Sequence, residues 1–261
     1  SASITTERIW NRPWPTIRVR YRNVDQVHFR LFAANWDDYL DRKRSRPESL
    51  RDDERTELLA RPVVRRWSAP LPATADYRER DFEVPVPEDL APGFYFLAAS
   101  HKEDFSEAKN QLSLTDVWVS DLALVLRPDA AELGGFVLEA GSGEPLAGAR
   151  VQAWYLNRQG ERVAVPEVAT DASGAFTLPL ANQRNYVVKA TARGQSVAAR
   201  DQFSGWYTAP RSGAAERTLI FVDRAIYRPG QTVQYKGICY RADRANDAYT
   251  VQAGRTLTIV F

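Results

Sequence analysis

The chain has 261 residues, which is enough for about two domains and the start of a third. A hydrophobic fraction of 44% and an aromatic fraction of 11% predict packed cores and exclude intrinsic disorder as the default state. The formal net charge of +2 argues against a nucleic-acid-binding surface, and one cysteine leaves no internal disulfide framework. No apolar run approaches the ~18 residues of a membrane span.

Residues 1–12 are interpreted as a linker, and the first predicted domain covers residues 13–127. Apolar residues alternate with arginines over Ile17–Tyr21 and with polar residues over Val27–Leu31. This period of two predicts an antiparallel hairpin closed by a turn at Arg22–Gln26. Further strands are predicted at Val63–Ser68, Tyr77–Val86, Gly93–Ala99 and Thr115–Leu126.

A charged segment, Trp36–Ala60, interrupts the strand pattern of the first domain. Trp36, Tyr39 and Leu40 share one helical face, and the pattern restarts at Pro47, a residue well placed in a first helical turn. The segment is therefore predicted to form two short helices as an insertion between strands. A structureless loop of this length is the less favoured alternative inside a compact domain.

The second predicted domain, residues 128–209, is a small β-sandwich. Its glycine-rich loop Gly141–Gly148 leads into a strand at Val151–Leu156. In Thr170–Phe176, Asp171 opens and Gly174 closes a turn. Asp201–Ala215 is interpreted as the linker to the next domain.

Residues 210–261 are predicted to begin a third domain that is truncated at Phe261. Leu219–Val222 is a strand by composition, and Arg228, Pro229 and Gly230 form a turn in which proline fixes one φ and glycine accepts a positive one. Val233, Tyr235 and Gly237 then follow the period of a half-buried strand, and Leu257, Ile259 and Phe261 predict a third.

Four separate sequence strings resemble those of the α2-macroglobulin family. The string that opens a macroglobulin domain is matched at Asp223, Arg224, Tyr227, Arg228, Pro229, Gly230 and Val233. Pro87–Tyr95 resembles a turn common in macroglobulin sandwiches, and Val117–Leu124 resembles a last strand in the bacterial branch. Gly143–Val151 followed by Thr170–Phe176 is similar to pre-albumin or carboxypeptidase-regulatory sandwiches, and the same string occurs in bacterial macroglobulin domains.

The resemblance implies an all-β fold of tandem antiparallel β-sandwich domains, macroglobulin-like or immunoglobulin-like. It implies a scaffold piece of a bacterial α2-macroglobulin-like, broad-spectrum protease trap, exported to the periplasm and often anchored by a lipidated N-terminus. The implied partners are proteases, through the full-length protein, and neighbouring macroglobulin domains of the same chain. No nucleic acid, cofactor, metal or catalytic residue is expected.

Few residues qualify as reactive or metal-binding sites. The family's thioester joins a cysteine to a glutamine three residues later, whereas Ala242 follows Cys239 at that spacing, so Cys239 is interpreted as a small structural thiol. His28 and His101 are the only histidines and cannot form a multi-histidine zinc site. Asp171 is interpreted as a turn cap because a calcium loop needs several oxygen ligands.

Four arginines, Arg18, Arg20, Arg22 and Arg30, are predicted to share one face of the first hairpin. An anionic partner is one interpretation of this face. A solvated face, or one paired with acidic residues of the same chain, is the favoured interpretation, because acids are abundant nearby in the sequence.

Two other classes of function remain open. A stalk of sandwich repeats in a surface adhesin would bind a glycan or a host protein, and further repeats ending in a recognition module would support it. An enzyme is the weakest interpretation, because the sequence shows no set of polar residues that could form a catalytic site.

Overall fold

The computed structural model describes residues 2–42, 46–74, 76, 78–106, 110–128, 132–179, 185–199, 203–204, 215–222, 232–243 and 248–258. The chain folds into two compact units, Ser1–Trp206 and Tyr207–Phe261. Within the described residues, strands dominate, and two short helices lie between the strands β4 (Gln26–Ala34) and β5 (Arg65–Pro70), so the predicted all-β sandwich class with a helical insertion is confirmed. Neither helix is long and apolar enough to cross a membrane.

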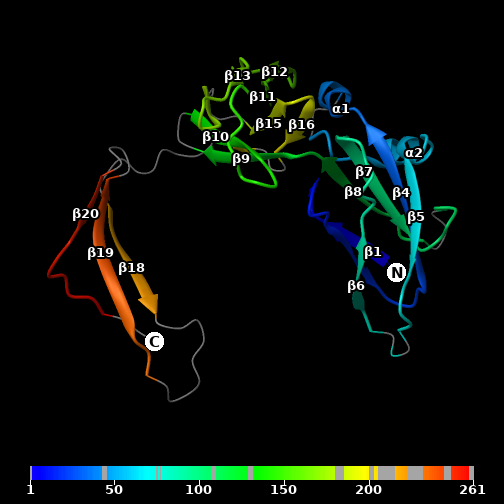
Figure 1. Cartoon of the computed structure of the whole chain (residues 1–261), viewed down its shortest axis with the longest axis horizontal. Coiled ribbons are helices and arrows are strands. Elements are labelled where there is room, and N and C mark those ends of the chain that lie inside the picture. Colours follow the sequence, from blue (N-terminus) through cyan, green and yellow to red (C-terminus); the bar gives the residue numbers. More distant parts are fainter. Residues whose placement is uncertain are drawn as a thin grey trace. The chain divides into compact units, whose positions relative to one another are not determined.

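The first sandwich consists of a three-stranded and a five-stranded sheet (Figure 1). The three-stranded sheet has the order β1 (Ala2–Thr6), β3 (Thr16–Tyr21), β6 (Arg80–Pro85). The five-stranded sheet has the order β2 (Ile9–Trp10), β8 (Ser113–Val119), β7 (Gly93–Ser100), β4 (Gln26–Ala34), β5 (Arg65–Pro70). Both sheets contribute to one core, in which Val19 and Phe29 are almost fully buried.

The prediction of a hairpin in the first domain is wrong, although the predicted alternation of buried and exposed residues along its two strands is correct. β3 pairs with β1 and β6, whereas β4 pairs with β5 and β7, so the two strands lie in different sheets. Ile17 and Leu31 enter the same core from opposite sheets. Asn23 in the connection has a left-handed φ of 56°, and its N–H donates to Thr74 Oγ1 at 2.9 Å. A period of two identifies the buried face of a strand but not its partner.

Ala2–Thr6 and Ile9–Trp10 form strands, in place of the linker predicted for residues 1–12. β1 pairs with β3, and β2 runs parallel to β8. Ala2, Ile4 and Trp10 are buried, and the Trp10 indole N–H donates to Glu7 O at 2.9 Å. Burial of this large aromatic ring with a satisfied polar atom ties the N-terminal segment into the sandwich.

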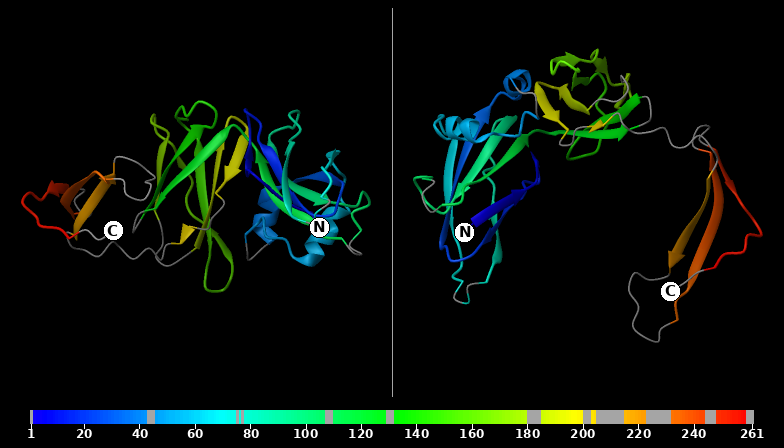
Figure 2. Two further views of the ribbon diagram at one scale, coloured as in Figure 1. Left: turned by 90° about the horizontal axis from the view of Figure 1, so that it is seen from below. Right: turned by 180° about the vertical axis from the view of Figure 1, so that it is seen from behind.

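The helical insertion covers the second face of the five-stranded sheet. Its helices are α1 (Trp36–Arg42) and α2 (Asp52–Leu59), and Figure 2 shows both beside the strands of the sheet. β7 is consequently buried on both faces: Leu97 belongs to the sandwich core, and Phe96 meets the Tyr39 ring at 5.4 Å between centroids. The Arg51 N–H donates to Glu54 Oε2 at 2.8 Å at the start of α2, which satisfies a free helix-end donor.

The second sandwich has two further sheets. One has the order β14 (Ala175–Pro179), β10 (Glu132–Glu139), β9 (Leu122–Pro128). The other has the order β12 (Arg162–Ala164), β11 (Arg150–Leu156), β15 (Asn185–Ala192), β16 (Gln195–Ala198), with β13 (Val168–Ala169) on β11 and β17 (Phe203–Ser204) on β15.

The predicted strand Thr115–Leu126 is divided between the two sandwiches. β8 ends at Val119 in the first sandwich, and β9 begins at Leu122 and pairs with β10 in the second. The structural boundary therefore lies at Ser120–Asp121 and not after Arg127. The Leu122 N–H donates to Ser120 Oγ at 3.2 Å. This local side-chain hydrogen bond takes the place of a backbone hydrogen bond between strands at Ser120–Asp121.

Asp171 caps a turn, as predicted. Its Oδ1 accepts the Ser173 hydroxyl at 2.7 Å and the backbone N–H groups of Ser173 and Ala175 at 2.8 Å and 3.0 Å. Gly174 closes the turn with a φ of +74°, and a Cβ there would lie 2.7 Å from Val137 O. These hydrogen bonds, chiefly the one from the Ser173 hydroxyl, lower the pKa of Asp171.

Replacing Asp171 by alanine is expected to lower the Tm, and replacing it by asparagine to lower it less, because an amide oxygen still accepts hydrogen bonds. The folded pKa lies below the ordinary value of 3.8, so the stabilisation is present above that value and is lost as pH falls through the folded pKa. The Tm difference between wild type and Asp171→Ala should stay constant from about pH 7 to pH 5 and shrink below about pH 4. A difference that grows on acidification would contradict this role.

The second unit contains an antiparallel sheet of β18 (Ala215–Val222), β19 (Tyr235–Asp243) and β20 (Ala248–Val251). The strand that follows β19 is β20, which was not predicted. Residues 255–258, where the predicted strand should begin, form no strand, and residues 259–261 of that prediction lie outside the described residues. The matched string Asp223, Arg224, Tyr227, Arg228, Pro229 and Gly230 lies outside the described residues, as does Phe261; Val233 is half-buried.

Candidate functional site

The two sandwiches of the first unit meet at a cluster of aromatic, charged and amide side chains, called the joint below. Its members are Arg8, Trp36, Glu48, Asp116, Trp118, Ser120, Asp121, Trp154, Lys189 and Gln195. Each sandwich and the helical insertion contribute to it.

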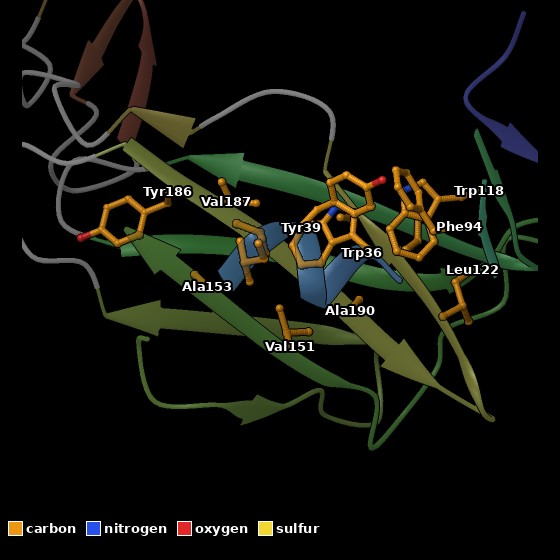
Figure 3. Packing of buried hydrophobic residues seen from close by; sticks show 14 of the residues in the cluster. Trp36, Tyr39, Phe94, Trp118, Leu122, Val151, Ala153, Tyr186, Val187 and Ala190 are labelled. Carbon is orange, nitrogen blue, oxygen red and sulfur yellow. The ribbon is translucent and has the colours of Figure 1, made fainter. Parts of the chain in front are cut away.

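Trp36, the first residue of α1, forms the apolar centre of the joint. It is 2% exposed, and its ring centroid lies 6.1 Å from that of Trp118 on β8 and 5.9 Å from that of Trp154 on β11. Figure 3 shows Trp36, Phe94 and Trp118 in a cluster that also includes Ala190 and Val187 of the second sandwich. A single hydrophobic cluster therefore continues from the first sandwich through α1 into the second.

Arg8 ties three parts of the chain together. Its Nε donates to Asp116 Oδ2 at 2.7 Å, its Nη2 to Glu48 Oε1 at 2.6 Å, and its Nη1 to Ala198 O at 3.0 Å. The acceptors belong to β8, the segment between the helices and β16. Glu48 Oε1 also accepts the Trp36 indole N–H at 3.0 Å. The side chains of Arg8 and Glu48 are 13% and 4% exposed, so the pair is shielded from water.

Gln195 fixes the short connection between the sandwiches. Its Oε1 accepts the Asp121 N–H at 2.7 Å and the Ser120 hydroxyl at 3.3 Å, and its Nε2 donates to Asp121 Oδ2 at 3.1 Å. The Ser120 N–H donates to Trp10 O at 3.2 Å. A two-residue connection bonded from both sandwiches leaves little freedom for one to rotate against the other.

A cleft of about 480 Å³ opens beside the joint, lined by Trp36, Arg61, Trp118 and Lys189 among others. Lys189 Nζ pairs with Asp37 Oδ1 at 2.5 Å and lies 5.5 Å from the Trp36 ring centroid. The lysine charge is therefore balanced by a carboxylate and an aromatic face. The residues around the cleft provide packing and ion pairing, without a nucleophile held against a base.

Of the residues singled out as reactive candidates, His28 and His101 of the first unit are not members of the joint, and Cys239 belongs to the second unit. Cys239 is half-buried on β19, and its Sγ lies 3.4 Å from Thr218 Oγ1. His28 lies on β4 and His101 follows β7, and burial lowers the pKa of His101. In the described part of the chain, no group of three or more histidine, cysteine, aspartate or glutamate side chains is placed to hold a metal ion.

The four predicted arginines do not share one face. Arg18 and Arg20 lie on β3 opposite Glu83 and Asp81, at N–O distances of 4.0 Å and 3.0 Å. Arg30 lies on β4 in the other sheet, and Arg22 follows β3. The prediction of intramolecular pairing holds for Arg18 and Arg20, and the single four-arginine face is wrong because the hairpin that would create it does not exist.

Sequence reasoning did not identify the charged members of the joint. Arg8 falls in the segment interpreted as a linker, and β16, which begins at Gln195, was not assigned as a strand. A single polar residue near a strand end carries no periodic signal, and its partners here lie 40 to 190 positions away. Trp36 was assigned to a buried helical face, and the structure confirms this.

Comparisons with known proteins show which solved structures have a similar fold. No protein-family profile matches the chain, and no curated protein matches it in sequence. Among solved structures, a segment of native α2-macroglobulin from Escherichia coli spanning domains NIE and MG1 has a TM-score of 0.57 at 16% identity, over 76% of this chain and 95% of that one. An E. coli segment spanning MG0, NIE and MG1 has a TM-score of 0.55 at 16% identity, over 76% of this chain and 63% of that one.

A mutant Salmonella α2-macroglobulin is also similar, with a TM-score of 0.52 at 16% identity. The match covers 98% of this chain, which spans 15% of the Salmonella protein. The chain therefore has the fold of consecutive domains in bacterial α2-macroglobulin structures.

Proposed function

We propose that the chain is a non-catalytic scaffold portion of a bacterial α2-macroglobulin-like protease trap. The observation that carries the proposal is the joint, at which two sandwiches share one continuous hydrophobic cluster. The fold of the chain also resembles a segment of α2-macroglobulin that spans the domains NIE and MG1. The match to the macroglobulin opening string at Asp223–Val233 adds independent support from the sequence.

The joint supports a mechanical role for these sandwiches. Aromatic packing around Trp36 and the bonds of Arg8 and Gln195 oppose rotation about Ser120–Asp121, so a force applied to one sandwich moves the other with it. In a trap whose domains rearrange after a bait segment is cut, such a rigid pair would transmit the displacement. The proposed location is the periplasm, and the proposed partners are proteases and neighbouring domains of the parent chain.

The non-catalytic part of the proposal has its own test. The 261-residue chain is expected neither to hydrolyse casein nor to reduce trypsin or elastase activity, because the residues around the joint are committed to packing and pairing. The parent protein is expected to reduce cleavage of casein by the same proteases while leaving a small chromogenic substrate accessible. Stoichiometric inhibition by the 261-residue chain, or a parent protein without any inhibition, would contradict the proposal.

An adhesin stalk is the second candidate, and no observation in the structure favours it. A stalk would bind a glycan or host protein through a terminal module, with these sandwiches as spacers. Binding of intact host cells by the parent protein, together with absent protease inhibition, would support that function instead.

A further inference from the structure

The proposed scaffold function does not explain a pair of arginines on the five-stranded sheet. Arg30 on β4 and Arg66 on β5 are direct cross-strand neighbours. They lie on the face opposite the core, because the adjacent Phe29 and Trp67 stack toward it with ring centroids 4.9 Å apart. Like charges directly opposite each other destabilise a sheet, so the pair requires a compensating group.

No acidic side chain of the described residues compensates Arg66. Arg66 is exposed and forms no ion pair within the part of the chain that the structure describes. Its neighbour Arg65, by contrast, binds Asp89 at 2.7 Å, and Arg20 on the other sandwich face binds Asp81. Arg30 donates through Nη2 to the backbone oxygen of Glu103 at 2.8 Å, which fixes its position without neutralising its charge.

The loop after β7 holds Arg30 in place by an unusual backbone conformation. Phe105 has a left-handed φ of 59° and is 5% exposed, and the Arg30 guanidinium carbon lies 4.1 Å from its ring centroid. A bulky residue in that region is strained, and such strain persists where the surrounding structure imposes it. Ser100 supplies part of this restraint by accepting the Lys102 N–H at 2.8 Å and donating to Lys102 O at 2.7 Å.

These elements enclose a groove of about 250 Å³, called the arginine groove below, lined by His28, Arg30, Arg66, Ser68, Glu103 and Phe105 with Phe29 and Trp67. Ser68 lies directly opposite His28, so hydroxyl and imidazole groups adjoin the two guanidinium groups. Burial, followed by the nearby Arg66 charge, lowers the pKa of Arg30, and the Asp104 and Glu103 carboxylates partly oppose this shift.

We propose that the arginine groove binds a carboxylate group of a partner protein segment, held between Arg30 and Arg66. Two guanidinium groups offer the parallel N–H donors that suit a planar carboxylate. Glu103 lines the groove, and Asp104 lies next to it in the chain, so a polyanion would meet repulsion there whereas a single carboxylate fits between the two cations. This inference goes beyond the scaffold function and does not depend on it.

The test follows the arginine Nε–Hε signals of the ¹⁵N-labelled 261-residue chain by NMR. Sodium acetate is titrated against sodium chloride at constant ionic strength. A blocked peptide with one glutamate is then compared with the same peptide carrying glutamine. Saturable shifts of Arg30 and Arg66 with acetate and with the glutamate peptide, absent with chloride and the glutamine peptide, are expected.

Two variants complete the test. Arg66→Gln is expected to weaken acetate and peptide binding at least about tenfold, the loss for one charge-assisted hydrogen bond. Arg18→Gln removes the same charge from an exposed arginine of the other sheet and should bind like wild type. Without ligand, Arg66→Gln should not lower the Tm, because it relieves a like-charge pair, and this also verifies folding.

Three results would overturn the proposal. Shifts that are equal with acetate and chloride would show screening only. Equal weakening by Arg66→Gln and Arg18→Gln would show a diffuse charge effect. Binding of acetate without preference for the glutamate peptide would leave a small free carboxylate as the ligand and would overturn the assignment to a protein segment.

Discussion

Replacing Trp36 by alanine is expected to lower the free energy of unfolding of the first unit by about 3–5 kcal/mol, the range for truncating a buried aromatic residue. The side chain is 2% exposed and contacts the rings of Trp118 and Trp154, which belong to different sandwiches. The substitution therefore opens a cavity at the joint and also removes one donor from Glu48. Urea denaturation followed by far-ultraviolet circular dichroism measures the loss.

Trp36→Phe is the matched control for that experiment. It keeps a ring between the sandwiches and removes the indole N–H that Glu48 accepts, so its loss should be smaller than that of Trp36→Ala. In Trp36→Ala the two sandwiches should also unfold less cooperatively. A loss under about 1 kcal/mol, the size for a surface substitution, would show that Trp36 does not hold the joint.

Replacing Arg8 by alanine is expected to cost about 3–5 kcal/mol, because removing one partner of a buried ion pair is strongly destabilising. Among the described residues, Glu48, which is 4% exposed, would retain only the Trp36 indole and Arg46, whose Nε lies 3.8 Å away. Ala198 O on β16 would also lose its donor from Arg8. Thermal and urea denaturation of the 261-residue chain measure the effect.

Two further variants distinguish the buried cluster from a surface ion pair. Arg20→Ala removes an exposed arginine paired with Asp81 and should leave the Tm close to that of wild type. Arg8→Ala combined with Glu48→Leu should recover part of the stability, because it removes the unpaired carboxylate. Equal effects of Arg8→Ala and Arg20→Ala would contradict the role assigned to Arg8.

The sequence predicted what depends on local pattern. Alternation over Ile17–Tyr21 and Val27–Leu31 identified the buried faces of β3 and β4, and the helical face of Trp36, Tyr39 and Leu40 is buried as expected. The Asp171 turn followed from side-chain hydrogen bonding within a few residues. Each of these features is decided by residues close together in the chain.

What failed depends on pairing between distant segments. Apolar and polar residues alternate along both β3 and β4. The same alternation would occur if the two strands paired as a hairpin or, as observed, if the chain crossed from one sheet to the other between them. The division of β8 from β9 depends on Gln195, which lies 74 positions from Asp121 and bonds its backbone. Arg8 likewise gains its role only when β8 and β16 come beside it. Period and composition contain no information on such contacts.

The most direct test of the rigid joint is a distance distribution between spin labels on the two sandwiches, measured by double electron–electron resonance. Val64 beside β5 and Val125 on β9 are 52% and 47% exposed, so Val64→Cys and Val125→Cys accept labels once Cys239 is replaced by serine. We predict one narrow distribution that broadens when Trp36→Ala is added. A broad distribution with Trp36 intact, or one unchanged by Trp36→Ala, would contradict a joint that makes the two sandwiches move as one body.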